Sequence, residues 1–175
     1  MKKKLIYIIA GVAIIGVGAA LFTGGVKLGT PAIGDARMSL PEPNIQGGAI
    51  LRTINARKST KEFDKREISE QILSDVLWAA WGVNSDGKRT IPTSRNRQDL
   101  TVYAIMPHGA FLYDAPNNEL VEITGEDLRP LFATQDYVMD AYLTLVYVGT
   151  DIPNATLHAG SAYQNVALYA ADAGL

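Results

Sequence analysis

The stretch that decides the fold runs from Arg57 to Met106. It opens with the basic segment RKSTK (57–61) and closes with the polar segment PTSRNRQ (92–98), which precedes LTVYAIM (100–106). The first segment places three cations and two hydroxyls in five residues, which suits a phosphate group. The second is rich in hydroxyls and amides, which suit the hydrogen-bonding edge of a flat heterocycle. Each is a common kind of polar loop by itself, so their order among the neighbouring elements carries the interpretation.

A capped helix is predicted between the two segments. Ser69 is a typical N-cap residue and Gly82 suits the C-terminal cap. The spacing between them gives one apolar stripe, formed by Ile72, Leu73, Val76, Leu77 and Ala80. Trp78 and Trp81 lie near the end of this helix, where we expect core or interface packing, with substrate stacking as the alternative.

The rest of the chain interleaves strands and helices. Residues 100–106 alternate between two faces, as in a half-buried strand, and residues 143–148 form a continuous apolar run that suits a strand buried on both faces. Phe63 is expected to anchor an extended stretch into the core. The other predicted elements are strands at 110–113 and 120–123 and helices at 49–57, 127–133, 135–141 and 155–173. This interleaving predicts an α/β or α+β domain.

The N-terminus has the pattern of an export segment. Three lysines (2–4) precede an apolar run from Leu5 to Phe22, and small residues at 18–20 suit cleavage. Residues 1–22 are therefore predicted to be a signal peptide or an uncleaved membrane anchor, with the domain exported to the periplasm or the outer face of the cytoplasmic membrane. Residues 23–48 are rich in Gly and Pro and predict a linker, which leaves 49–175 as the domain.

Bulk composition limits the function classes. The net charge of −2 argues against a nucleic-acid partner, and the absence of cysteine excludes disulfides, thiol catalysis and cysteine-based metal sites. Ten of the 16 basic residues lie between Arg52 and Arg97, so the half with both polar segments fits an anionic small ligand or a solvated face. His108 and His158 lack the spacing of a metal pair, and we expect both to be ordinary turn or helix residues.

Together the segments resemble the flavin-binding pattern of the nitroreductase family. Residues 57–61 match R-x-S-x-[RK], and residues 92–98 match P-[ST]-x-x-N-x-Q. The order of helix, basic segment, capped helix, polar segment and alternating strand also resembles that family over about residues 49–175. The resemblance implies an α+β fold with a central, mostly antiparallel sheet flanked by helices in an intertwined homodimer. Leu112-Tyr113-Asp114 is more similar to the secreted or azoline-dehydrogenase-like branches, and the chain is expected to lack the family's C-terminal end.

The resemblance also implies a cofactor and its contacts. Flavin mononucleotide (FMN) would be held at phosphate, ribityl chain and ring edge by Arg57, Ser59 and Lys61, with Lys58 as a further contact or a solvated residue. Asn96 would bond the pyrimidine part of the ring. The remaining implied lining residues, some of them across a dimer interface, are Pro92, Thr93, Ser94 and Gln98. No catalytic side chain and no metal ligand are expected, because hydride transfer belongs to the flavin.

The implied activity is reduction of nitroaromatic, quinone or enone acceptors by ping-pong hydride transfer. NAD(P)H is the implied donor, although outside the cytoplasm a membrane quinol or another protein would replace it. Two alternatives stay open: a dehydrogenase that oxidises a heterocycle or peptide, and a non-catalytic flavin-binding envelope protein. An uncleaved N-terminal segment would add membrane contact.

Overall fold

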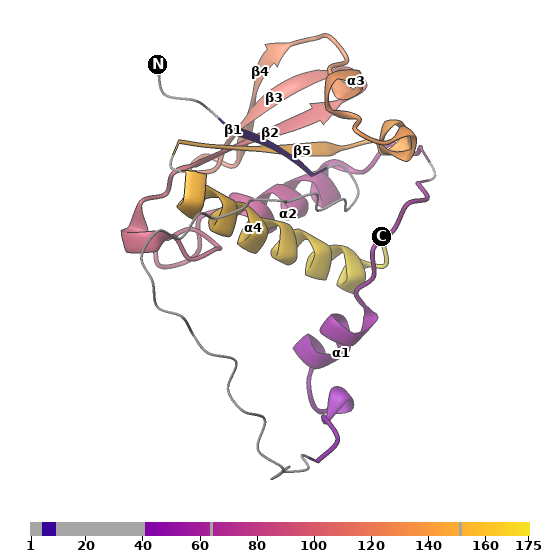
Figure 1. The fold of residues 1–175 in the computed structure, drawn as a ribbon, viewed down its shortest axis with the longest axis vertical. Helices are drawn as coiled ribbons and strands as arrows, with labels where there is room; N and C mark the ends of the chain where they lie inside the picture. Colours follow the sequence, from indigo (N-terminus) through magenta and orange to yellow (C-terminus); the bar gives the residue numbers. More distant parts are fainter. Residues whose placement is uncertain (1–4, 10–40, 64, 151) are drawn as a thin grey trace, which may run out of the picture.

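The protein is described by a computed structural model that covers residues 5–9, 41–63, 65–150 and 152–175. For residues 5–9, 152 and 153 it describes the backbone alone. Figure 1 shows a sheet with helices packed below it and a short helix on its other side, and one further helix extends away from the lower layer.

The sheet has five strands, and each neighbouring pair is antiparallel. Along the chain the strands are β1 (Leu5–Ile9), β2 (Leu100–Met106), β3 (Gly109–Asp114), β4 (Glu119–Thr124) and β5 (Thr144–Gly149). Their order in the sheet is β1-β5-β2-β3-β4, so β2 is central and β5 and β3 flank it. The expected α+β class with an antiparallel sheet flanked by helices is confirmed.

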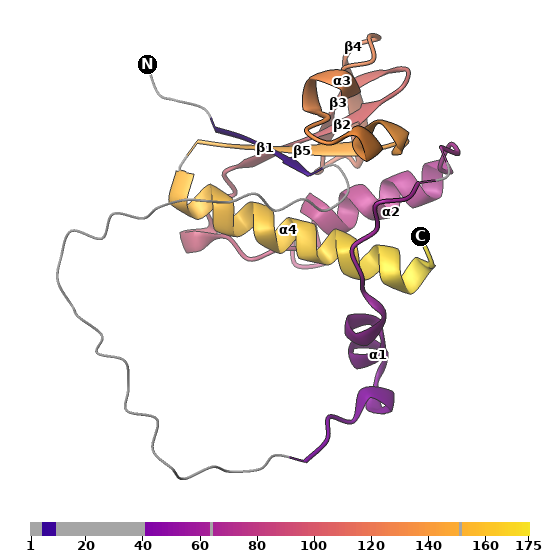
Figure 2. The same cartoon turned by 45° about the vertical axis from the view of Figure 1, so that its right-hand side comes forward.

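The helices divide between the two faces of the sheet. They are α1 (Ala49–Ala56), α2 (Glu70–Trp81), α3 (Arg129–Phe132) and α4 (Ile152–Ala173), with 3₁₀ turns at Ile45–Gly47, Ser94–Asn96 and Asp136–Asp140. In both views α2 and α4 lie side by side beneath the sheet, whereas α3 lies on the other side (Figures 1 and 2). Helix α1 contacts α4 and extends away from both layers (Figure 2).

The caps predicted for α2 are present. The Ser69 hydroxyl accepts a hydrogen bond from the backbone N–H of Ile72 at 3.2 Å, and Gly82 follows the last helical residue. Of the two tryptophans, Trp81 is buried and Trp78 is 48% exposed. The indole N–H of Trp78 donates to the carbonyl of Val83, so this exposed ring is held in place by the loop after the helix.

The main core lies between the sheet and the pair α2 and α4. Alternate β2 side chains enter it and meet small residues of α4, and its members include Leu77, Trp81, Leu100, Val102, Met106, Tyr147, Ala155, Ala159 and Ala162. Ile105 and Val146 point to the opposite face, where Leu128 and Phe132 of the α3 region cover them. Both predictions for these strands, alternation in β2 and burial of β5 on two faces, are confirmed.

Three local predictions need correction. Residues 136–140 form a 3₁₀ turn instead of an α-helix, and the predicted helix at 127–133 shrinks to the single turn of α3. Helix α4 begins at Ile152, three residues before its predicted start, because Pro153 occupies its first turn, where a proline needs no N–H partner.

The N-terminal segment enters the sheet where the structure describes it. Residues 5–9 pair antiparallel with Leu145–Gly149 of β5. The rest of the predicted signal or anchor, and residues 23–40 of the predicted linker, lie outside the described residues. No helix among the described residues is long and apolar enough to span a membrane.

Candidate functional site

The two predicted segments approach α4 at different levels. Before the first segment, the Thr53 hydroxyl of α1 donates to Asp172 at 3.1 Å, near the C-terminal end of α4. The second segment meets the other end, where the Ser94 hydroxyl donates to Asn154 at 3.1 Å. These two contacts are 18 residues apart on one helix, a rise of roughly 27 Å. Thr53 precedes the first segment by four residues, and Arg57 of that segment influences Tyr163, nine residues from Asn154, so the segments themselves are separated by roughly 14 Å along α4.

The first segment offers cations without acidic partners. Lys58, Ser59 and Lys61 are exposed and Arg57 is half-buried. No carboxylate of the described residues pairs with Arg57, Lys58 or Lys61, whose charges are therefore available to an anion. Burial raises the pKa of Tyr163 in the middle of α4, and the Arg57 charge partly opposes this rise, so Arg57 faces that part of the helix.

Aromatic contacts hold the second half of this segment. The Lys61 ammonium lies 6.0 Å from the centre of the Tyr137 ring, and Phe63 stacks on the same ring at 6.5 Å between centroids. Phe63 is half-buried, so it anchors the extended stretch through Tyr137. The Lys61 side chain therefore points toward the 136–140 turn.

The second segment has a constrained backbone. Three of its residues adopt positive φ angles without being glycine: Arg95 at 54°, Asn96 at 53° and Gln98 at 48°. A side chain in this conformation costs on the order of 1 kcal/mol per residue, so other contacts must hold the loop. Clusters of such residues are typical of functional sites, where the strain fixes the side chains for a ligand.

A histidine of α4 supplies one of these contacts. Nε2 of His158 accepts the backbone N–H of Ser94 at 2.8 Å, and Nδ1 lies 2.6 Å from Oδ1 of Asp99. A nitrogen that accepts an N–H carries no proton, so this His158 is neutral and donates its Nδ1–H to Asp99. His158 is 1% exposed. The other carboxylate oxygen of Asp99 is buried with no hydrogen-bond partner in the described structure.

These three residue types also build serine hydrolase triads, but this geometry is different. The Ser94 hydroxyl donates to Asn154, and the imidazole receives the Ser94 backbone N–H instead. A nucleophilic serine needs its hydroxyl on the imidazole. The group therefore positions the loop. We predicted His158 only as a helix residue, because the contact spans 64 positions and has no local sequence signal.

A second set of contacts holds the end of the loop. Nε of Arg89 donates to Oε1 of Gln98 at 3.0 Å, and the Gln98 amide nitrogen donates to Oδ1 of Asn96 at 3.3 Å. The backbone N–H of Gln98 donates to the Thr93 hydroxyl at 3.3 Å. The side chain of Gln98, which was predicted to contact the ligand, therefore makes hydrogen bonds to Arg89 and Asn96 of the protein itself. Asn96 is exposed, and its amide nitrogen has no partner among the described residues.

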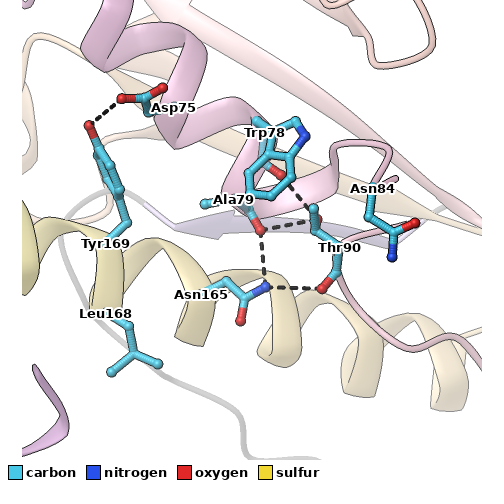
Figure 3. Close-up of a pocket in the computed structure, with 8 residues that line it drawn as sticks. All are labelled: Asp75, Trp78, Ala79, Asn84, Thr90, Asn165, Leu168 and Tyr169. Carbon is cyan, nitrogen blue, oxygen red and sulfur yellow. Dashed lines mark hydrogen bonds between the residues drawn. The ribbon is translucent and has the colours of Figure 1, made fainter. Parts of the chain in front are cut away.

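Two pockets lie on the described surface along α4. One, of about 490 Å³, lies between α2, the loop at 84–90 and α4, and is lined by Asp75, Trp78, Ala79, Asn84, Thr90, Asn165, Leu168 and Tyr169 (Figure 3). Asn165 donates there to the carbonyls of Ala79 and Thr90. The other, of about 510 Å³, is a hollow on the exposed face of α4 around Leu157 and Gly160. None of the nine predicted site residues lines either pocket.

Fold and site together define a class of protein: an antiparallel α+β domain with a basic segment and a polar loop that is hydrogen-bonded to α4. The family model described as "Nitroreductase family" matches residues 54–175. The chain therefore belongs to the nitroreductase family, a family of oxidoreductases. The crystal structure of a candidate nitroreductase from Ralstonia eutropha JMP134 is similar, with 35% identity and a TM-score of 0.68 over 77% of this chain and 71% of that one. A search of curated proteins found no match.

Proposed function

We propose that the protein is an FMN-dependent oxidoreductase that passes hydride to a nitroaromatic, quinone or enone acceptor. Membership of the nitroreductase family supports the flavin. The observation that carries the proposal is the loop at 93–98, whose strained backbone is hydrogen-bonded to the buried His158 while Asn96 stays exposed. Such a loop is built for a ligand, since a solvated loop needs no such support.

The residues present suit the chemistry of FMN. The phosphate is a dianion, and Arg57, Lys58 and Lys61 carry charges that no described carboxylate neutralises. Ser59 adds an exposed hydroxyl beside them. The pyrimidine edge of the flavin ring has carbonyl acceptors, which match the free amide nitrogen of Asn96. Pro92, Thr93 and Ser94 complete the proposed wall on the ring side.

A second copy of the chain is part of the proposal. The family resemblance implies that some lining residues act across a dimer interface, so a partner would complete the site. Large apolar side chains without cover support the same view: Ile50 is 72% exposed and Ile54 49% on α1, and Leu157 is 63% exposed on α4. Exposed apolar faces of this kind are typical of interfaces.

The bound flavin would supply the hydride chemistry, and the chain's own residues would bind and orient it. Arg57, Ser59 and Lys61 would hold the phosphate end. Asn96 would orient the ring edge, and His158 and Arg89 would keep the loop around it in shape. No protein acid or base is assigned, in keeping with the family resemblance. The expected export of the domain favours a quinol or protein donor over NAD(P)H in the cell.

The absorbance spectrum of the purified protein tests the cofactor. We expect a yellow protein that releases FMN on denaturation, with flavin retention weakened at least tenfold by Arg57→Ala or Ser59→Ala. Lys88→Ala removes an exposed cation outside both segments and is the control. A colourless protein that cannot be reconstituted with FMN would overturn the proposal.

Turnover assays separate the proposed reductase from its alternatives. Steady-state reduction of a nitro compound with NADPH, or with a quinol, is expected for the reductase. Flavin that is reduced only by a heterocyclic or peptide substrate would instead indicate the dehydrogenase. Bound flavin that neither type of substrate reduces would indicate a binding protein.

A further inference from the structure

Arg89 is held on three sides, although it lies outside both predicted segments. Its guanidinium carbon lies 4.7 Å from the centre of the Trp81 ring, Nη1 donates to the Trp81 carbonyl at 3.1 Å, and Nε donates to Gln98. Burial lowers its pKa, and the nearby Tyr113 and Asp114 oppose this change. A guanidinium has five donors and no acceptor and stays charged in proteins. Whatever faces Nε of Arg89 must therefore accept a hydrogen bond.

This requirement fixes the polarity of two side-chain amides in turn. Gln98 must present its oxygen to Arg89, so its nitrogen is the atom that faces Asn96. Asn96 must then present its own oxygen to Gln98, which leaves its amide nitrogen pointing out of the loop. The order of donors follows from Arg89, because a guanidinium has only donors and each amide must then turn its oxygen toward the preceding donor.

We propose that Arg89 and Gln98 are positioning residues that fix Asn96 as a hydrogen-bond donor toward the ligand. The site then selects a ligand whose facing atom is an acceptor, such as a ring carbonyl, and disfavours one whose facing atom is an N–H. This inference rests on the proposed flavin function for the identity of the ligand, but the orientation of Asn96 itself does not. It changes the role of Gln98 from a ligand contact to a support.

An isosteric substitution inverts the predicted polarity. In Gln98→Glu the carboxylate still accepts from Arg89, and it forms an ion pair with it. The carboxylate has no donor for Asn96, so the Asn96 amide is expected to rotate and present its oxygen to the ligand. If Arg89 only stabilised the loop, the Asn96 amide would not rotate, because the introduced carboxylate would keep the hydrogen bond from Arg89. Gln98→Met, which loses both polar atoms, frees Asn96 without inverting it and is the second variant if the first does not fold.

The experiment has two readouts. The first is the side-chain amide signals of Asn96 in ¹H–¹⁵N NMR spectra of the full chain without flavin, assigned by their loss in Asn96→Asp. The second is affinity for FMN and for riboflavin, which lacks the phosphate. We expect Gln98→Glu to change the chemical shifts of the Asn96 amide and to weaken the binding of both FMN and riboflavin about tenfold. Lys88→Met removes a positive charge next to Arg89 in the sequence and is expected to change neither readout.

Each outcome decides a separate point. Unchanged Asn96 signals, or unchanged affinity for both flavins, would overturn the positioning role. A loss of affinity for FMN alone would also overturn it, since the added charge would then be acting on the phosphate. If the unsubstituted protein binds neither flavin, the proposed function fails, while the NMR comparison still decides whether Arg89 and Gln98 orient Asn96.

Discussion

The backbone N–H of Ser94 donates to Nε2 of His158 across 2.8 Å and joins the strained polar loop to the core helix α4. Because His158 is buried and its other nitrogen faces Asp99, the imidazole has a defined donor side and a defined acceptor side. The loop thus depends on a buried residue that lies in the layer between sheet and helices and does not reach the protein surface.

Two substitutions of His158 test its two hydrogen bonds separately, the one from Ser94 and the one to Asp99. His158→Asn keeps a donor for Asp99 but loses the acceptor for Ser94, and His158→Gln keeps the acceptor but loses the donor. Each is expected to lower the free energy of unfolding by about 1–3 kcal/mol, because one buried polar group is left without its partner. Only His158→Asn is expected to speed hydrogen exchange at the Ser94 amide, which NMR measures directly.

The chain's other histidine is the control for this pair. His108 is exposed and its ring lies against Phe111 and Tyr142, away from the loop, so His108→Gln should leave Ser94 exchange unchanged. Equal exchange at Ser94 in the His158→Asn and His158→Gln variants would show that His158 does not hold the loop.

Gly149 marks a close approach between sheet and helix. A Cβ added at this position would overlap the Cβ of Ala155, at the point where β5 meets the start of α4. Both residues are buried, so neither backbone moves aside without repacking. Gly149→Ala is expected to cost about 2 kcal/mol of unfolding free energy, measured by urea denaturation. Gly125→Ala, whose nearest neighbour is 3.8 Å away, should cost much less, and equal costs would contradict the packing argument.

Alkaline pH tests the burial of Tyr147. This side chain is 1% exposed in the core, and burial raises its pKa above the ordinary value of 10. The unfolded chain therefore releases this proton first. Its contribution to stability is complete below pH 10 and is lost as pH rises from 10 toward the folded pKa, by about 1.4 kcal/mol per pH unit. Tyr147→Phe should flatten the alkaline decline measured by urea titration at several pH values, and an unchanged slope would contradict this prediction.

Local patterns identified the elements that local chemistry determines. The hydroxyl of Ser69 caps α2, and alternating residues from Leu100 to Met106 form β2, because each signal lies within one turn or one strand. Such patterns also gave the two polar segments. Local patterns could not predict the strand order of the sheet, because the pairing of Leu5–Ile9 with β5 joins residues about 140 positions apart.

The supports of the candidate site were missed for a similar reason. In the sequence, nothing distinguishes His158 from the other residues of its helix, and nothing distinguishes Arg89 from the other surface cations. Their roles arise from contacts with Ser94 and Gln98 that only the folded chain creates. Residues that hold a site are harder to predict than residues that line it, because a ligand's chemistry says nothing about what lies behind the lining.

Self-association tests whether a second copy completes the site. Ile50 on α1 and Leu157 on α4 are 72% and 63% exposed, and a charge at either position should split a dimer that buries them. We expect Ile50→Glu and Leu157→Glu to lower the molar mass measured by light scattering to that of one chain and to weaken FMN retention together with it. Leu131 on α3 is 74% exposed on the other side of the sheet, so Leu131→Glu should change neither quantity. A monomeric unsubstituted protein that retains FMN would show that one chain suffices.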